Sequence, residues 1–269
     1  MPKFLFWNMG QKPMLPVLKA VAEENDVDIL ILAESPNTPG EVLITINADV
    51  SAYHYALGQC SRISIFTRFD GSYLIPLEES DRYSIRKLAM PARQEVILVG
   101  VHLPSQLHFV ESDIGEECRI LAKVIRDIEA EQGHSRTLLL GDLNLNPFDE
   151  GIATANGLHA VMSRRVALRG DRIIQGNHYP FFYNPMWAHF GDRTSDVAGT
   201  YFYQKAKHKM YFWNIFDQVL LRPGLVGNFS HDQVRILTVA GTQSLVDDNG
   251  CPNRTLGSDH LPVLLDLDF

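Results

Sequence analysis

Hydrophobic residues recur along the chain with two different spacings, and these predict strands and helices. Short apolar runs, several of them rich in β-branched residues, are typical of β-strands. Apolar residues spaced three or four apart predict amphipathic helices at 13–24 and 111–132, the second ending before Gly133. The strands are expected at 4–8, 28–34, 63–67, 72–77, 82–88, 95–103, 137–142, 199–203, 214–221, 234–240 and 261–267.

The balance of these elements predicts an α+β fold. Many strands with few helices favour packed β-sheets flanked by helices. The close spacing of the strands between 63 and 103 is that of antiparallel hairpins. With 45% hydrophobic residues the chain can bury a large core, and no repeat or linker divides it. We therefore expect a single domain over residues 1–269.

Polar residues lie in or beside nearly every one of the long apolar strands. In LLLGDLNLNPF, Asp142 and Asn144 are two residues apart, so a continued strand would point both side chains to one face. Each position alone has an ordinary explanation, such as a turn set by Gly141 and Pro147. If the strands share one core, however, their ends can converge on one cleft. The full set is Asn8, Glu34, His102, Asp142, Asn144, Asp217, Asp259 and His260.

These residue types together support only a few kinds of metal binding and catalysis. Carboxylates with amide oxygens suit Mg²⁺ or Mn²⁺, whereas zinc would favour more His or Cys ligands. Two histidines suggest proton transfer or stabilisation of a charged phosphoryl group, and metal-assisted attack of water on a phosphate ester fits best. Asp259 and His260 are neighbours and face opposite sides of an extended chain, so Asp217 is the available acid to orient His260.

Six motifs in fixed order resemble the endonuclease/exonuclease/phosphatase superfamily, the deoxyribonuclease I-like phosphoesterases. They are FWN (6–8), LAES (32–35), VHLPS (101–105), GDLNLNP (141–147), FDQVL (216–220) and GSDHLPV (257–263). The resemblance spans nearly the whole chain. It implies a four-layer α/β sandwich of two packed, mostly antiparallel or mixed β-sheets, and an Mg²⁺-dependent phosphoric ester hydrolase.

The resemblance also implies a role for each residue. Glu34 would be the principal Mg²⁺ ligand, with Asn8 and Asp259 completing the metal site. Asp142 would orient or deprotonate the attacking water, and Asn144 would hold the phosphate or the aspartate. His260, paired with Asp217, would stabilise phosphoryl charge, and His102 resembles the general acid of deoxyribonuclease I and the sphingomyelinases. Gln218 departs from the family, which often carries Tyr or His there.

Charge is distributed unevenly. The formal net charge is −8, but residues 164–209 hold eight Lys or Arg and three Asp. This stretch is either a footprint for phosphates or a solvated basic surface. Its candidate substrate contacts are Lys205, Lys207, Lys209, Arg164 and Arg165.

Aromatic clusters between Tyr179 and Trp213 are interleaved with those lysines. They could stack bases or belong to the core. Three widely spaced cysteines without a CxxC motif, and an N-terminus without a leader pattern, predict a reduced, cytoplasmic protein with no membrane insertion.

Together these features favour a nuclease that hydrolyses nucleic-acid phosphodiester bonds. Two alternatives stay open. The substrate could be a small or lipid-derived phosphate ester of the inositol phosphate or sphingomyelin type, or the chain could be a catalytically silent module that binds nucleic acid or another partner.

Overall fold

The computed structural model describes residues 1–49, 52–191, 197–206 and 208–269, and these build two large mixed β-sheets. The first sheet has the order β16-β19-β1-β2-β4-β3, the second β5-β6-β7-β8-β15-β12-β9. The first consists of β1 (Lys3–Asn8), β2 (Ile29–Ala33), β3 (His54–Tyr55), β4 (Ile63–Thr67), β16 (Val234–Ile236) and β19 (Val263–Asp266). The second consists of β5 (Leu74–Glu79), β6 (Tyr83–Leu88), β7 (Val96–His102), β8 (Thr137–Asp142), β9 (Ala160–Val161), β12 (Phe182–Tyr183) and β15 (Asp217–Leu221).

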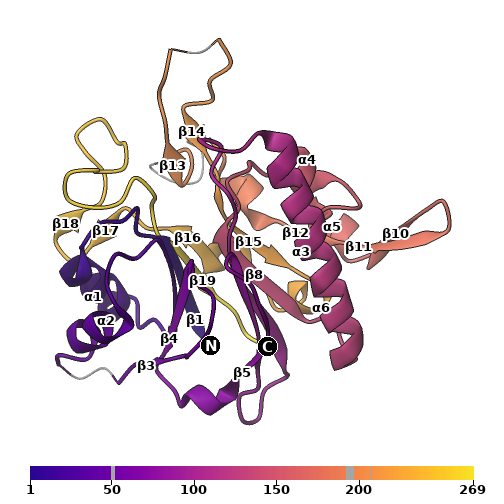
Figure 1. Cartoon of the computed structure of the whole chain (residues 1–269), viewed down its shortest axis with the longest axis horizontal. Helices are drawn as coiled ribbons and strands as arrows, with labels where there is room; N and C mark the ends of the chain where they lie inside the picture. The colour runs from indigo at the N-terminus through magenta and orange to yellow at the C-terminus, as the bar shows by residue number, and fades with distance from the viewer. Residues whose placement is uncertain (50–51, 192–196, 207) are drawn as a thin grey trace.

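Helices cover the outer faces of both sheets, which gives the four layers of an α/β sandwich (Figure 1). Helices α1 (Leu15–Glu24) and α2 (Pro39–Ile46) cover the six-stranded sheet, and α3 (Glu111–Gln132) covers the seven-stranded one. The shorter elements are α4 (Glu150–Ala153), α5 (Arg164–Ala167), α6 (Pro223–Val226), the 3₁₀ turns η1 (Gly71–Tyr73), η2 (Pro185–His189) and η3 (His231–Gln233), and the two-stranded pairs β10 (Asp171–Ile174) with β11 (Asn177–Pro180), β13 (Tyr201–Phe202) with β14 (Trp213–Asn214), and β17 (Val239–Ala240) with β18 (Gln243–Ser244). No helix among these is long and apolar enough to cross a bilayer.

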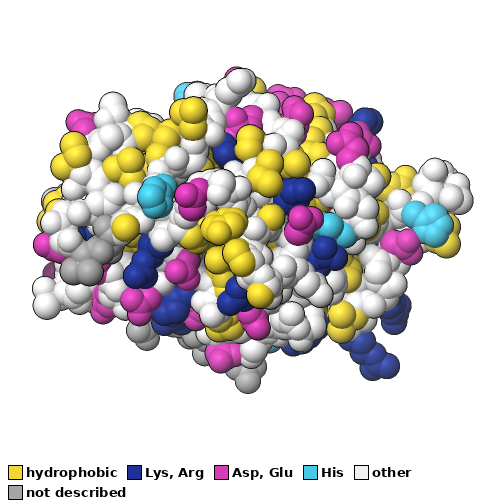
Figure 2. Space-filling view, turned by 90° about the horizontal axis from the view of Figure 1, so that it is seen from below, with side chains coloured by type: hydrophobic (Ala, Val, Ile, Leu, Met, Phe, Trp, Pro, Cys, Tyr) yellow, Lys and Arg dark blue, Asp and Glu magenta, His cyan; other side chains and the backbone are white. Residues whose placement is uncertain are grey.

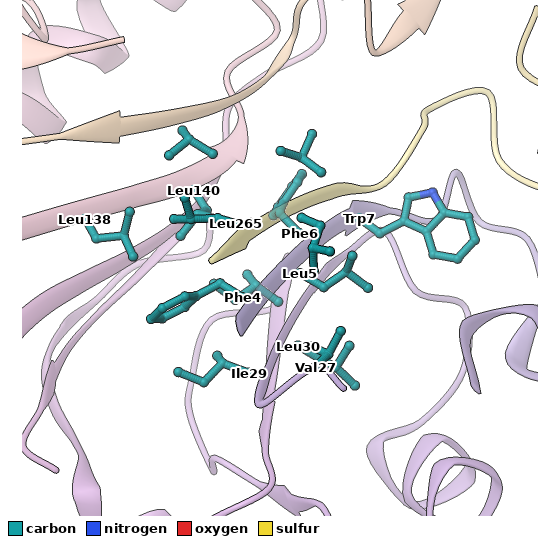
Figure 3. Close-up of a cluster of buried hydrophobic side chains, with 14 of the residues drawn as sticks. Phe4, Leu5, Phe6, Trp7, Val27, Ile29, Leu30, Leu138, Leu140 and Leu265 are labelled. Atoms are coloured by element: carbon teal, nitrogen blue, oxygen red, sulfur yellow. The ribbon is translucent and has the colours of Figure 1, made fainter. Parts of the chain in front are cut away.

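The core lies between the sheets and continues beneath the helices. Alternate residues of β1 point to opposite faces, so Phe4 and Phe6 reach toward the second sheet while Leu5 and Trp7 lie on the other side (Figure 3). Leu138 and Leu140 of β8 belong to the same buried cluster, and all these side chains are at most 1% exposed. Central strands buried on both faces explain why the sequence shows continuous apolar runs there.

The sequence prediction of an α+β sandwich is confirmed, with local errors. Both predicted helices are present, but α2 was missed although its capping box was readable: Glu41 accepts a bond from the Thr38 amide at 2.8 Å. The expected strand 234–240 is split, because Val239–Ala240 turns back at Gly241 to pair with Gln243–Ser244. Strand 199–203 is reduced to Tyr201–Phe202, and 214–221 is divided between β14 and β15.

A buried ion pair ties α3 to the seven-stranded sheet. Arg222, which follows β15, donates to both carboxylate oxygens of Glu129 at 2.8 and 3.2 Å, and its guanidinium lies 3.9 Å over the Phe182 ring. Both charged side chains are at most 8% exposed. Removing one partner leaves the other charge buried without compensation.

We expect Glu129→Ala to lower the free energy of unfolding by about 3–5 kcal/mol, because Arg222 would lose its counter-charge. Urea unfolding followed by circular dichroism measures the change. Glu131→Ala, on the exposed side of the same helix, is the matched control and should change stability by less than about 0.5 kcal/mol. Equal effects of the two substitutions would show that the ion pair does not anchor the helix.

Candidate active site

Three neighbouring strands place three ionisable side chains in one row. His102 of β7 is in register with Asp142 of β8, and Asp142 is in register with Asp217 of β15. Paired residues of adjacent strands share a face of the sheet, so the three side chains emerge together. Gly141 permits the close approach of β7 and β8 here, because a Cβ on it would lie 2.1 Å from the Val101 carbonyl oxygen.

The six-stranded sheet delivers two more groups to the same place. Strands β1 and β2 are parallel, so Asn8 at the end of β1 and Glu34 just after β2 lie at one edge. The Asn8 amide donates to Asp142 Oδ2 at 2.9 Å, which joins the two sheets through one hydrogen bond. Glu34 Oε1 lies 3.1 Å from His102 Nε2, and this contact holds the pKa of Glu34 below its usual value despite partial burial.

His260 and Asp217 form a buried pair. Both Asp217 oxygens lie within reach of His260 Nδ1, at 2.8 and 3.1 Å, so the pairing expected from the alternation of the chain is present. The Trp7 indole donates to the His260 carbonyl at 2.9 Å, and the Tyr201 ring lies 4.5 Å from the imidazole. The imidazole is thereby fixed with Nε2 directed toward Asp142, 3.9 Å from Oδ2.

The surrounding carboxylates favour the protonated form of His260. Burial alone lowers its pKa, but Asp217, Asp142 and Asp259 outweigh burial and raise the pKa to about 10. At neutral pH the side chain is therefore an imidazolium that can donate from Nε2.

The GDLN segment reaches the site by a turn, the ordinary explanation that the sequence offered beside a continued strand. Strand β8 ends at Asp142, whose Oδ1 accepts a bond from the Asn144 backbone amide at 2.8 Å. Asn144 has φ +50° and its side chain donates to the Leu103 carbonyl at 2.9 Å. Asp142 and Asn144 thus meet at one cavity because the backbone folds back, not because they alternate along a strand.

One cavity of about 410 Å³ collects most of the predicted residues. Asp217 and His102 lie behind its wall, where they contact His260, Asp142 and Glu34. A larger cavity of about 590 Å³ runs along β16 and contains none of the predicted residues. The predicted residues that line the smaller cavity are Asn8, Glu34, Asp142, Asn144, Lys209, Asp259 and His260.

The oxygen donors at this cavity fit a divalent cation. Carboxylates from Glu34 and Asp259 and the amide oxygen of Asn8 are hard ligands of the kind Mg²⁺ prefers. Asp259 lies next to Gly10, which has φ +54°. A Cβ added at Gly10 would lie 2.9 Å from Asp259 Oδ1. Among the described residues, only Asp142, Asp217 and His260 bring three ligand atoms of His, Cys, Asp or Glu within 4.8 Å of one another, but the Asp217 oxygens are engaged by His260, which favours a dyad there.

A buried amide network beneath the site was not predicted from the sequence. Gln218 donates to the Leu145 and Ile215 carbonyls at 2.7 and 3.0 Å and accepts a bond from Asn184. Asn146 donates to Asn214 at 3.0 Å and accepts from the Ile215 amide. The signals were present in the second Asn of LNLNP and in the unusual Gln218, which here holds the loop after Asp142 against β15.

The basic candidates separate in space. Lys209 lines the cavity, Lys205 lies 5.2 Å over the Tyr203 ring, and Lys207 lies outside the described residues. Arg164 was predicted to contact substrate, but it donates to the Val226 and Phe229 carbonyls near α6, beyond the end of β15 opposite Asp217. Arg165, on the same short helix, shares that remote position.

The surface seen from below, opposite the β13–β14 hairpin, shows acidic and basic side chains interspersed without a continuous basic surface (Figure 2). Arg164 and Arg165 do not line the cavity, and Arg164 is bound to carbonyls near α6.

Several solved structures are similar in fold to this chain. Neisseria 3′ phosphatase NExo, bound to a product DNA hairpin, is similar with TM-score 0.56 and 16% identity, covering 100% of both chains. D. rerio TDP2 complexed with single strand DNA product gives TM-score 0.54 and 17% identity, covering 98% of this chain and 97% of that one. An endonuclease/exonuclease/phosphatase family protein from Leptotrichia buccalis gives TM-score 0.57 and 12% identity over 100% of both chains.

The two sheets and their flanking helices thus form the fold that these solved structures share, one of them an endonuclease/exonuclease/phosphatase family protein. No family model matches the sequence, and no curated protein matches it.

The raised pKa of His260 has a measurable consequence for stability. A group whose pKa is higher in the folded than in the unfolded state stabilises the fold below its unfolded pKa and loses this effect as pH rises through the folded value. In chelator, we expect the unfolding free-energy difference between wild type and His260→Gln to be constant below about pH 6.5 and to shrink toward pH 10. Urea titrations at several pH values measure it; a pH-independent difference would show that His260 is not held as an imidazolium.

Proposed function

We propose that the chain is a metal-dependent phosphodiesterase that hydrolyses nucleic-acid phosphodiester bonds. The observation that carries the proposal is the placement of Asp142. It is fully buried beneath the cavity, bonded to Asn8 and close to the two histidines His102 and His260. A carboxylate held this way beside further oxygen donors suits the activation of water next to a phosphate.

Each group in the site has a role that its contacts allow. Glu34, Asn8 and Asp259 would hold Mg²⁺, with Mn²⁺ as a substitute; when bound, the cation would neutralise phosphoryl charge and lower the pKa of water. Asp142 accepts the proton of the attacking water. Its own position is fixed by the Asn8 amide and the Asn144 backbone amide.

The histidines act on opposite sides of Asp142. His260, as an imidazolium held by Asp217, donates to the phosphoryl oxygens and stabilises the charge of the transition state. His102 contacts Glu34 Oε1 at 3.1 Å from behind the cavity wall and holds the pKa of that carboxylate low, while its role as general acid stays a prediction. Asn144 is available to contact the phosphate from the cavity wall.

Nucleic acid is favoured over the other phosphate esters by two observations. Two proteins of similar fold are described with bound DNA, the Neisseria phosphatase and D. rerio TDP2. The cavity is also lined by aromatic side chains beside Lys209, which suits bases and phosphates. A small or lipid-derived phosphate ester remains the second candidate substrate, because the arginines predicted to extend the basic surface lie elsewhere.

We expect hydrolysis of bis-p-nitrophenyl phosphate to require Mg²⁺ or Mn²⁺ and to stop in excess chelator. Glu34→Gln removes a charged ligand while keeping its shape, so cation affinity measured by calorimetry should fall on the order of 10-fold or more, together with turnover. Glu131→Gln, far from the cavity, is the control. Full activity in chelator would exclude the metal-dependent reaction, and cation binding without turnover of any phosphate ester would indicate the catalytically silent module.

Asp142→Asn keeps the size and one hydrogen-bond acceptor of the side chain but removes its charge. We expect kcat to fall on the order of 10²-fold or more with KM nearly unchanged, because proton acceptance from water is lost mainly in the transition state. Steady-state kinetics with the small diester measure this, and circular dichroism checks the fold. Wild-type kcat in a folded variant would mean that GDLN is only a structural turn.

A further inference from the structure

The hairpin beside the cavity joins aromatic rings to lysines in a repeated arrangement. Strands β13 and β14 pair Tyr201 with Asn214, and the Tyr203 amide donates to the Phe212 carbonyl at 2.8 Å. The described residues of the loop between these strands project away from both sheets (Figure 1). On it, Lys205 Nζ lies 5.2 Å from the Tyr203 ring centroid, and Lys209 Nζ lies 5.5 Å from that of Tyr211.

This hairpin is connected directly to the catalytic groups. Tyr201 lies 4.5 Å from His260 and stacks with Tyr203 at 6.2 Å, with only 16° between the ring planes. Tyr203, Lys209 and Tyr211 line the same cavity as Asp142 and His260. A row of rings therefore leads outward from the dyad histidine to the solvent-exposed loop.

We propose that the two tyrosine–lysine pairs of this hairpin, Tyr203 with Lys205 and Tyr211 with Lys209, bind unpaired bases and phosphates, and that the substrate is single-stranded nucleic acid. The inference rests on the proposed function and specifies its substrate. A lysine over an exposed ring interacts more weakly than a stacked base does. A base can thus displace the lysine and stack on the tyrosine ring. The displaced lysine ammonium then lies close to the nucleic-acid backbone and can contact the next phosphate.

The charge of the cavity supports this assignment. Besides the catalytic carboxylates, Glu111 and Asp149 line it, so its floor repels a polyanion. Burial raises the pKa of Asp149 to about 6, which leaves it mostly ionised at neutral pH. Beyond the His260 imidazolium and a bound cation, the hairpin supplies Lys205 and Lys209 to attract a nucleic-acid chain.

The preference for a single strand follows from base geometry. In a duplex both faces of each base are covered by its neighbours, so an exposed tyrosine ring gains a stacking partner only if the duplex is opened. Three other aromatic residues of the same sequence region do not offer this surface. Phe181, Phe182 and Tyr183 are at most 5% exposed and belong to the core.

Fluorescence anisotropy in chelator tests binding apart from catalysis, with a labelled 12-nucleotide oligothymidylate and a hairpin duplex of equal length. We expect the single strand to bind at least about 10-fold more tightly. Tyr203→Ala and Tyr211→Ala should each weaken it on the order of 10-fold, whereas Tyr→Phe at either position should retain binding because stacking needs the ring alone. Phe212→Ala is the matched control: Phe212 is 45% exposed against 47% for Tyr211, on the same hairpin, but does not line the cavity.

The lysines are tested by salt dependence. Lys205→Gln and Lys209→Gln should each reduce the slope of log Kd against log salt by about 0.7, the value for one lost contact to a single strand. Equal affinity for both nucleic acids, or Tyr→Ala variants that bind like Phe212→Ala, would overturn the inference. If the inference is overturned in this way but the small diester is still hydrolysed, the proposed function stands. If the protein binds single strands selectively but hydrolyses no phosphate ester, the proposed function is wrong and the hairpin is a binding site only.

Discussion

The register between β8 and β15 places two fully buried carboxylates, Asp142 and Asp217, directly opposite each other. Two like charges in a protein interior are unfavourable unless each is bonded to donors or paired with a cation. Asp142 receives donors from Asn8 and the Asn144 backbone, and Asp217 is paired with His260. Asn8 and His260 both come from segments of the other sheet, so these carboxylates are satisfied only when the sheets are packed.

The same requirement explains why fold and site cannot be separated in this protein. The ends of β1 and β2 and the segment before β19 must meet the ends of β7, β8 and β15 at one edge of the sandwich. The Trp7 indole, bonded to the His260 carbonyl, links the hydrophobic core to the dyad. Packing between the sheets thus fixes the distances on which the proposed chemistry depends, while the hairpin above the site is free to differ in sequence.

Much of this arrangement could be predicted because strand periodicity is a local signal. Asn8, Glu34 and Asp142 end apolar runs, and the alternation of side chains was enough to pair His260 with Asp217 rather than Asp259. Arg164 could not be placed this way, because its partners are carbonyls more than 60 residues away. The sequence left open whether the chain turns at Asn144 or continues as a strand, since the turn depends on the Leu103 carbonyl of a neighbouring segment. Long-range contacts of this kind leave no periodic pattern.

Glu34 adopts φ +48° and Asn144 φ +50°, a left-handed conformation that costs most residues other than glycine on the order of 1 kcal/mol or more. Glycine would relieve the cost at Glu34, but it would also remove the carboxylate that contacts His102. At this position the backbone conformation therefore favours glycine, whereas the contact with His102 requires glutamate. Selection for stability alone would be expected to replace Glu34 by glycine. Retention of glutamate in this left-handed conformation would therefore indicate selection for catalysis.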